Sequence, residues 1–244
     1  HLQAAELAES LPERLASYSN YLLGLHYLEE DGQAIYKAAC RYDSFFSAVI
    51  PFSHERHAVH EKLRIGYISP DFRAHIAACF SWALLADYDR ECFEVYCYAN
   101  CQEDDMSSQL AGLAGHWRNI RGLSPQKAAA QIYGDEIDIL VELAGHTRDN
   151  GLPVLAFRPA PVQVSGIGYM STTGLSTVDY FLSDSFLDGE AAPGAEMKSP
   201  DFSETLLQLP DSHFCWHPFF AGEPCGAAPV GKNGFVTFGS LNQF

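Results

Sequence analysis

The sequence predicts an α/β fold in which helices cover a parallel β-sheet and a helical hairpin precedes that sheet. Over roughly the first fifty residues, apolar side chains recur every three or four positions, as they do along one face of a helix. From residue 63 onward, short apolar runs alternate with helical patterns, which is the signature of successive βαβ units. Hydrophobic residues make up 47% of the chain and charged residues only 19%, a balance that indicates a packed domain.

Residues 1–50 are expected to form two helices packed as a hairpin. Asp31 and Gly32 separate the two helical patterns, since both residue types disfavour the interior of a helix. Each helix then has one apolar face that needs a partner. These faces contain Leu7, Leu11, Leu15, Tyr18, Leu22 and Leu25 in the first helix, and Ile35, Ala38, Ala39, Tyr42, Phe45 and Phe46 in the second.

Residues 51–62 follow the hairpin and are polar. They contain His54, His57 and His60 at spacings of three, a pattern that could bind a metal ion if the segment were helical. However, no carboxylate or cysteine is placed to complete such a site. We therefore interpret the stretch as a solvated linker and predict no metal site in the chain.

Residues 63–217 are predicted to form one Rossmann-like domain with a parallel sheet. Its first βαβ unit comprises strand 63–69, helix 75–88 and strand 93–99. Ser124 and Pro125 introduce a later helix, because serine caps a helix N-terminus and proline fits the first helical position. The remaining helices are expected at 105–115 and 126–133, and the remaining strands at 117–120, 137–143, 161–167 and 178–182, with a short apolar pairing at 206–209.

The last part of the chain differs in composition from the predicted domain. Residues 218–234 are rich in proline and glycine, so we interpret them as an interdomain linker. Residues 235–240 read as a fresh strand, the first of a second domain that would include 235–244. Because Phe244 closely follows this strand with no turn or cap, we expect the chain to be cut from a longer protein.

The charge and the cysteine content limit the classes of binding partner and the cellular compartment that we expect. The formal charge of −16 makes nucleic acid a poor partner, since such binding depends on lysine and arginine. No run approaches the roughly 18–20 apolar residues of a membrane span, and no export signal opens the sequence. The seven cysteines contain no C-x-x-C pair, which favours reduced thiols and a cytoplasmic location. A zinc site at Cys92, Cys97 and Cys101 is disfavoured, because that cluster starts in a predicted strand and ends in a loop.

Polar side chains follow four of the predicted strands at the point where each strand ends. In an open parallel sheet these carboxyl ends lie along one edge, where ligands bind and helix N-termini point free N–H groups. Each residue alone also has a structural interpretation: Ser69 and Asp71 could cap a helix, and His146 could be a hydrogen-bonded loop residue. Their gathering at one edge nevertheless predicts a site. The four polar loops are 70–75, 144–150, 168–174 and 183–184.

Asp71 and His75 have the residue types and spacing of an acid–base pair. Imidazole titrates near neutrality, and a carboxylate four positions earlier can fix its tautomer, so His75 can act as a general base. The sequence contains no G-x-S-x-G elbow, Walker loop or H-E-x-x-H motif, which disfavours an esterase, an NTPase or a zinc protease. Residues 166–168 lack the third glycine of a dinucleotide fingerprint.

An ordered set of motifs resembles the SPINDLY/O-GlcNAc transferase family of protein glycosyltransferases. Similar order and spacing extend from about residue 15 to residue 244, and the whole set is far more specific than any one motif. The motifs are LRIGYISPDFRAH at 63–75, IDILVELAGHT at 137–147, RPAPVQV at 158–164, GIGY at 166–169, TTG at 172–174, VDY at 178–180, LPD at 209–211 and GFVTFGS at 234–240.

The resemblance implies a fold and a reaction. Members have a GT-B architecture of two facing Rossmann-like domains, preceded by helices that often continue a tetratricopeptide array. They transfer a sugar from a nucleotide donor to a Ser/Thr hydroxyl of a protein, with inversion and without a metal or other cofactor. This chain would then be the N-terminal half, with the acceptor protein or peptide and the nucleotide sugar as partners. The donor-binding C-terminal domain would be missing, so we expect no turnover by this chain alone.

The resemblance also implies roles for individual residues. His75 matches a histidine proposed as a base or orienting residue, and Asp71 matches the aspartate beside it. The positions that match substrate-contacting residues are His146, Thr147, Ile167, Gly168, Tyr169, Asn242 and Gln243. The donor is UDP-GlcNAc or GDP-fucose, and the sequence does not separate the two.

Three positions depart from the family pattern, namely Cys40, Ile76 and Met170. They keep open a second interpretation, in which the chain is a non-catalytic peptide-binding scaffold derived from such an enzyme. A third interpretation, an unrelated small-molecule enzyme of the Rossmann type, is disfavoured by the ordered motifs.

Overall fold

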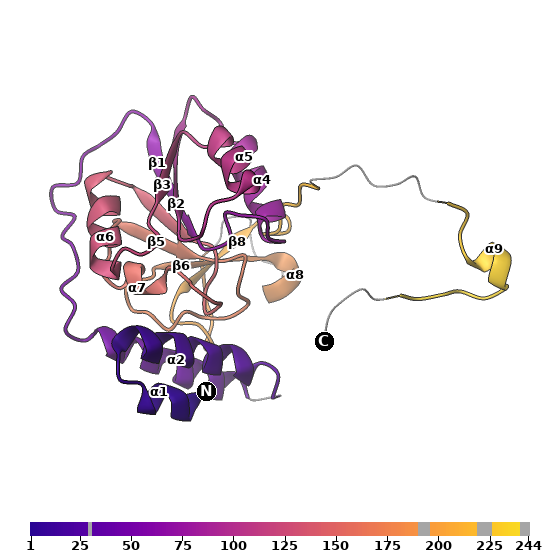
Figure 1. Cartoon of the computed structure of the whole chain (residues 1–244), viewed down its shortest axis with the longest axis horizontal. Coiled ribbons are helices and arrows are strands. Elements are labelled where there is room, and N and C mark those ends of the chain that lie inside the picture. Colours follow the sequence, from indigo (N-terminus) through magenta and orange to yellow (C-terminus); the bar gives the residue numbers. More distant parts are fainter. Residues whose placement is uncertain (29–30, 190–195, 219–225, 240–244) are drawn as a thin grey trace.

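The computed structural model describes residues 1–28, 31–189, 196–218 and 226–239. An eight-stranded sheet forms the centre of the molecule, with helices on both of its faces and the N-terminal helices packed below it in the view of Figure 1. This confirms the predicted α/β class. Within the described residues, no helix combines the length and apolar character needed to cross a bilayer.

The strand order is β3-β2-β1-β4-β5-β6-β8-β7, and every pairing is parallel except that of β7 with β8. The order therefore reverses between β1 and β4, as in doubly wound nucleotide-binding sheets. The strands are β1 (Leu63–Ser69), β2 (Phe93–Ala99), β3 (His116–Asn119), β4 (Ile139–Glu142), β5 (Val162–Ser165), β6 (Tyr180–Asp184), β7 (Glu196–Lys198) and β8 (Thr205–Leu209).

Helices cover the two faces of the sheet and build two separate cores. One core joins α2, α3, α6 and α7 to one face and includes Leu22, Tyr42 and Leu140. The other joins α4 and α5 to the opposite face and includes Leu85 and Val141. The helices are α1 (Leu2–Leu7), α2 (Leu11–Leu25), α3 (Gly32–Asp43), the 3-10 turn η1 (Ser44–Phe46), α4 (Ala78–Ala86), α5 (Asp105–Leu113), α6 (Pro125–Gly134), α7 (Leu152–Leu155), α8 (Ser185–Asp188) and α9 (Val230–Asn233).

The N-terminal helices differ from the predicted hairpin at one point. Ser10 and Glu13 form a capping box that starts α2, so the first expected helix is broken into α1 and α2. The α2–α3 pair docks on the sheet domain through Gly174, whose φ of +71° and close approach to α3 require glycine. A Cβ atom there would lie 2.1 Å from the Ala39 carbonyl oxygen.

Two other predictions were wrong in detail. The helix expected at 75–88 begins only at Ala78. Before it, the Ala77 N–H donates to the His75 ring, and the Ala78 N–H donates to the His75 carbonyl oxygen three residues back, so the chain there forms a tight turn. The strand expected at 235–240 is not formed over its described part, 235–239, and α9 lies inside the expected linker. No strand pairs with 235–239 among the described residues, and without a partner a strand leaves its backbone groups unbonded.

The stretch 51–62 is not the solvated linker that the sequence indicated. It has no helix, yet His57 and His60 both contact Asp138, a carboxylate that directly precedes β4. Phe52 also stacks on Tyr133 of α6, with ring centroids 4.4 Å apart. The segment is therefore held against the sheet domain at Phe52, His57 and His60, while half of its residues are exposed to solvent.

Candidate active site

Two polar loops meet where the strand order reverses. The loop after β1 carries Asp71 and His75, and the loop after β4 carries Thr147. Because β1 and β4 are parallel neighbours, both loops leave the same edge of the sheet, next to the switch point at which such folds bind ligands. The sequence-predicted gathering of polar loops at this edge agrees with the strand order.

A cleft of about 880 Å³ opens between these loops. Five of the residues predicted as catalytic or substrate-binding line it: Asp71, His75, Thr147, Ile167 and Gly168. Arg73, Arg121 and Arg148 border the same cleft and offer positive charge to a phosphate-bearing ligand. Phe80 and Phe214 form an apolar wall, with ring centroids 5.1 Å apart.

Asp71 and His75 lie side by side at the mouth of this cleft. Asp71 Oδ1 is 3.4 Å from His75 Nδ1, and the side chains are 17% and 40% exposed. Burial raises the pKa of the Asp71 carboxyl, while the positive charges of His75 and Arg73 oppose that rise. The pair is thus a shielded carboxylate with a more accessible imidazole.

The His75 ring has two competing partners at Nδ1. The Ala77 N–H donates to this atom over 3.2 Å, which places the proton of a neutral ring on Nε2. If Nδ1 instead carries the proton and points it at Asp71, Nε2 is free to accept a proton from a ligand. A proton acceptor at Nε2 therefore requires the second tautomer, and Asp71 is the group that favours it.

Glu142 is a fully buried carboxylate beneath the loop that carries Thr147. Its Oε2 accepts the N–H groups of Ala144 and Gly145 at 3.1 and 2.5 Å, and its Oε1 accepts that of Gly151 at 3.0 Å. Burial raises the pKa of Glu142 to about 7, although the three hydrogen bonds act in the opposite direction. Glu142 was not among the residues predicted from the sequence, although an acidic side chain within the apolar run 137–143 was an available signal.

His146 does not line the cleft in the structure. It is fully buried, its Nδ1 lies 3.0 Å from Ser19 Oγ, and its Nε2 lies 2.8 Å from the Thr173 carbonyl oxygen. Since that carbonyl can only accept, Nε2 donates and Nδ1 accepts from the serine hydroxyl. Burial lowers the pKa of His146 to about 4, so the ring is neutral and joins α2 to the sheet domain.

Tyr169 is also buried, and its hydroxyl lies 3.0 Å from His26 Nε2. It contacts the N-terminal helices rather than the cleft. The two remaining predicted substrate contacts, Asn242 and Gln243, lie outside the described residues.

The wall of the cleft contains a strained backbone position that the sequence did not indicate. Ile167 has a φ of +76°, in the left-handed region that a β-branched residue rarely adopts. Its neighbour Gly168 passes so close to the loop after β4 that a Cβ atom there would lie 2.3 Å from the Leu143 carbonyl oxygen. Strain of this kind is found at ligand sites, where the surrounding structure holds it in place.

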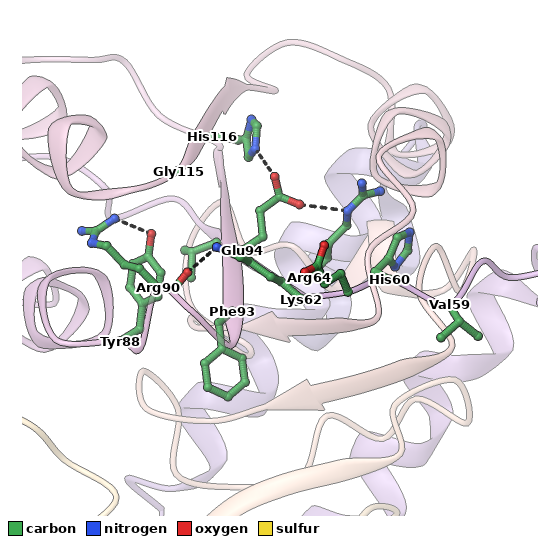
Figure 2. Close-up of a pocket in the computed structure, with 12 residues that line it drawn as sticks. Val59, His60, Lys62, Arg64, Tyr88, Arg90, Phe93, Glu94, Gly115 and His116 are labelled. Atoms are coloured by element: carbon green, nitrogen blue, oxygen red, sulfur yellow. Dashed lines mark hydrogen bonds and ion pairs between the residues drawn. The ribbon is translucent and has the colours of Figure 1, made fainter.

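A second cleft, of about 620 Å³, opens at the opposite edge of the sheet. Figure 2 shows that its charged side chains are engaged within the protein: Glu94 bridges Arg64 and His116, and the Lys62 ammonium donates to the Arg90 carbonyl oxygen. Its main charged groups are therefore already paired within the protein.

The fold and the cleft together define a Rossmann-type α/β domain with a carboxylate–imidazole pair at the switch point of its sheet. A family model described as glycosyl transferase family 41 matches residues 43–218. The chain belongs to glycosyl transferase family 41, which confirms the resemblance found in its motifs.

Similar proteins are protein glycosyltransferases by name. The chain is 37% identical over 241 residues to the probable UDP-N-acetylglucosamine–peptide N-acetylglucosaminyltransferase SPINDLY of Solanum lycopersicum, a match that covers 95% of this chain and 25% of that protein. The UDP-N-acetylglucosamine–peptide N-acetylglucosaminyltransferase of Caenorhabditis elegans is 32% identical over 166 residues, covering 67% and 13%. A mutant O-GlcNAc transferase of Thermobaculum terrenum has a similar structure, with a TM-score of 0.70, 29% identity and coverage of 84% and 39%.

The chain thus spans about a quarter of the length of the SPINDLY relatives that it matches over most of its own length. The similarity includes the sheet domain with its cleft, because the family match extends from α3 to beyond β8.

Proposed function

We propose that this chain forms the acceptor side of a protein O-glycosyltransferase, with Asp71 and His75 at the reacting hydroxyl. The observation that carries the proposal is the carboxylate–imidazole pair at the mouth of the switch-point cleft, 3.4 Å apart. Thr147, Ile167 and Gly168 line the same cleft and would contact sugar or acceptor. The family supports the same class of reaction, since the named relatives transfer N-acetylglucosamine to peptides.

In the proposed reaction a Ser/Thr hydroxyl oxygen attacks the anomeric carbon of the sugar. The bond between that carbon and the phosphate oxygen breaks, and its electron pair leaves with the nucleoside diphosphate. His75 takes the hydroxyl proton at Nε2, while Asp71 accepts the Nδ1–H hydrogen bond and stabilises the imidazolium. Attack opposite the leaving group inverts the configuration at the anomeric carbon.

The names of the relatives favour UDP-GlcNAc as the donor, and GDP-fucose is the second donor to test. The expected donor-binding domain would begin at 235–244, after the linker 218–234, and would face the cleft described above. Residues 1–50 would be the end of a tetratricopeptide-like region, and the protein would act in the cytoplasm. Asn242 and Gln243 would belong to the substrate-binding residues, with Gln243 at the donor nucleotide.

A second candidate function is a non-catalytic scaffold that binds peptides in the same cleft. It is favoured by the Ala77 N–H bond to His75 Nδ1, which leaves Nε2 protonated, and by Ile76, an exposed apolar residue at the cleft. Met170 is also exposed, whereas Cys40 is a half-buried residue of α3.

Incubation of the full-length gene product with a cell lysate and radiolabelled UDP-GlcNAc or GDP-fucose would distinguish the two functions. We expect label transfer by the wild-type protein and a loss of about 100-fold or more in His75→Ala. His116→Ala is the matched control, since His116 is paired with Glu94 at the opposite edge and should leave transfer unchanged. Equal transfer by His75→Ala would rule out the catalytic role, and no transfer from either donor would favour the scaffold.

A further inference from the structure

Two histidines and an aspartate converge at the edge of the sheet that lies away from the cleft. His57 and His60 precede β1, and Asp138 precedes β4, so the cluster lies at the amino ends of these parallel strands. The candidate active site lies at their carboxyl ends. Seven strand residues separate the two edges along β1, which corresponds to roughly 20 Å. The cluster is therefore separate from the proposed reaction.

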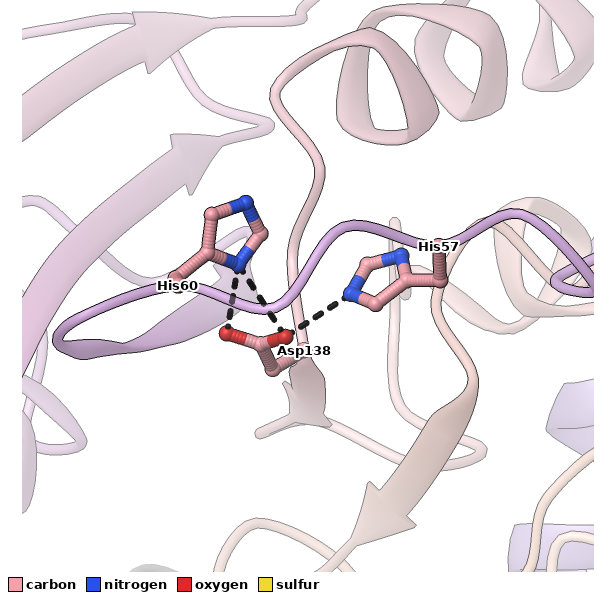
Figure 3. Close-up of side chains that lie close together, drawn as sticks. All are labelled: His57, His60 and Asp138. Atoms are coloured by element: carbon pink, nitrogen blue, oxygen red, sulfur yellow. Dashed lines mark hydrogen bonds and ion pairs between the residues drawn. The ribbon is translucent and has the colours of Figure 1, made fainter.

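The three side chains are close enough to share one ion (Figure 3). His57 Nε2 lies 2.8 Å from Asp138 Oδ1, and His60 Nδ1 lies 3.1 Å from Asp138 Oδ2. One donor atom of each side chain lies within 4.8 Å of the other two. The side chains are only 17%, 11% and 14% exposed, so solvent reaches the cluster without separating its members.

The protein holds this cluster in place through its backbone. The Arg64 N–H donates to Asp138 Oδ2 over 2.8 Å, and the Asp138 N–H donates to the Arg64 carbonyl oxygen over 3.0 Å. These bonds fix the carboxylate at the junction of β1 and β4. The second ring nitrogen of His60 lies 3.5 Å from Glu136 Oε2, an arrangement by which carboxylates orient metal-binding imidazoles.

We propose that His57, His60 and Asp138 bind a Zn²⁺ ion that anchors the 51–62 segment to the sheet. Two imidazole nitrogens and one carboxylate oxygen are ligands that zinc accepts, with water in the fourth position. Mg²⁺ and Ca²⁺ prefer sites made of oxygen atoms, so this set discriminates against them. All three proposed ligands lie within the described residues. His54 is not a proposed ligand, because its Nε2 lies 2.9 Å from the Arg158 carbonyl oxygen.

Only small movements separate the observed geometry from a zinc site. With metal–ligand distances of about 2.0–2.1 Å, neighbouring ligand atoms of a tetrahedral ion lie roughly 3.4 Å apart. The present nitrogen–oxygen separations of 2.8–3.2 Å would widen by a few tenths of an ångström, and the two histidine nitrogens, which lie within 4.8 Å of each other, would settle at roughly 3.4 Å.

Zinc titration of the purified protein tests the proposal, with binding measured by calorimetry and by metal analysis after dialysis. We expect one equivalent of Zn²⁺ and a melting temperature several degrees higher with zinc than with a chelator. His57→Gln and His60→Gln should each weaken binding by at least about tenfold. His116→Gln is the matched control, because His116 forms a similar 2.8 Å contact with Glu94 but belongs to no group of three potential metal ligands in the described part of the chain.

A spectroscopic measurement keeps the test independent of variant stability. Co²⁺ in the wild-type protein should give the visible absorption of a four-coordinate ion, and added Zn²⁺ should remove it. Circular dichroism would establish that each variant is folded. The proposal is overturned if the wild-type protein binds no zinc at about 100 µM, or if folded His57→Gln and His60→Gln bind it as tightly as His116→Gln.

Discussion

Replacement of Glu142 by glutamine tests whether a buried acid beneath the cleft titrates near neutral pH. Burial raises the pKa of Glu142 from 4.5 to about 7, so the folded protein holds this proton more tightly than the unfolded chain does. The resulting stability is fully present below pH 4.5 and is lost as the pH rises through 7. Over that interval the change corresponds to about 3 kcal/mol, at 1.36 kcal/mol for each tenfold change in proton affinity.

Glutamine removes this titration but keeps the size of the side chain. Its oxygen can accept from Ala144 and Gly145, whereas its NH2 group then faces the Gly151 N–H, so one buried hydrogen bond is lost. That loss costs about 1–3 kcal/mol at any pH. We therefore expect the stability difference between wild type and Glu142→Gln to be larger at pH 5 than at pH 8, by about 2–3 kcal/mol.

Urea denaturation of both proteins at pH 5, 6, 7 and 8 measures this difference. All other titrating groups are common to the two proteins, so their contributions cancel in the comparison. Glu61→Gln is the control for removal of one carboxylate, since Glu61 is exposed and far from the cleft-side loop. A difference between wild type and Glu142→Gln that is constant with pH, or that grows as the pH rises, would refute the reasoning.

Three further substitutions test the docking of the helices and the acid–base pair. Gly174→Ala should lower the free energy of unfolding by at least about 2 kcal/mol, because its Cβ would lie 2.1 Å from the Ala39 carbonyl oxygen. A loss below about 1 kcal/mol in urea denaturation would show that α3 can shift to accommodate the methyl group. Leu22→Ala should cost about 2–5 kcal/mol in the same assay, since the side chain is fully buried, and a near-neutral result would contradict the packing of α2 on the sheet domain. In the full-length product, Asp71→Asn should lower kcat about 100-fold with little change in KM for the acceptor; unchanged kcat in steady-state assays would show that Asp71 does not orient His75.

Local patterns in the sequence predicted most of the sheet, whereas many contacts that position the site residues join parts of the chain that are far apart in sequence. Strand 63–69 and strand 93–99 were predicted at their observed bounds, because apolar runs with turn residues on both sides are local signals. The Asp71–His75 pair was also visible, since both residues lie on one loop four positions apart. His146 was not predictable in the same way, because its partner Ser19 is 127 positions away in the chain.

The same limit explains why the histidines of 51–62 were interpreted as solvated. The carboxylate that they contact, Asp138, is 78–81 positions away and comes next to them only when β4 pairs with β1. Parallel neighbours place residues that precede each strand at one edge and residues that follow it at the other. The β1–β4 pair thus brings Asp138 to the histidines at its amino ends and brings the Glu142 loop to Asp71 at its carboxyl ends.

This arrangement gives the two edges different physical tasks. At the carboxyl ends, Glu142 holds the loop of Thr147 through backbone N–H groups, and Ile167 keeps a strained conformation, so the cleft is shaped before any ligand arrives. At the amino ends, charged groups are paired with one another.

A change at Asp138 should therefore loosen the 51–62 segment without altering the Asp71–His75 distance, whereas a change at Glu142 should move Thr147 relative to His75. Hydrogen exchange in the two loops would separate these effects, and coupled changes at both edges would contradict the division.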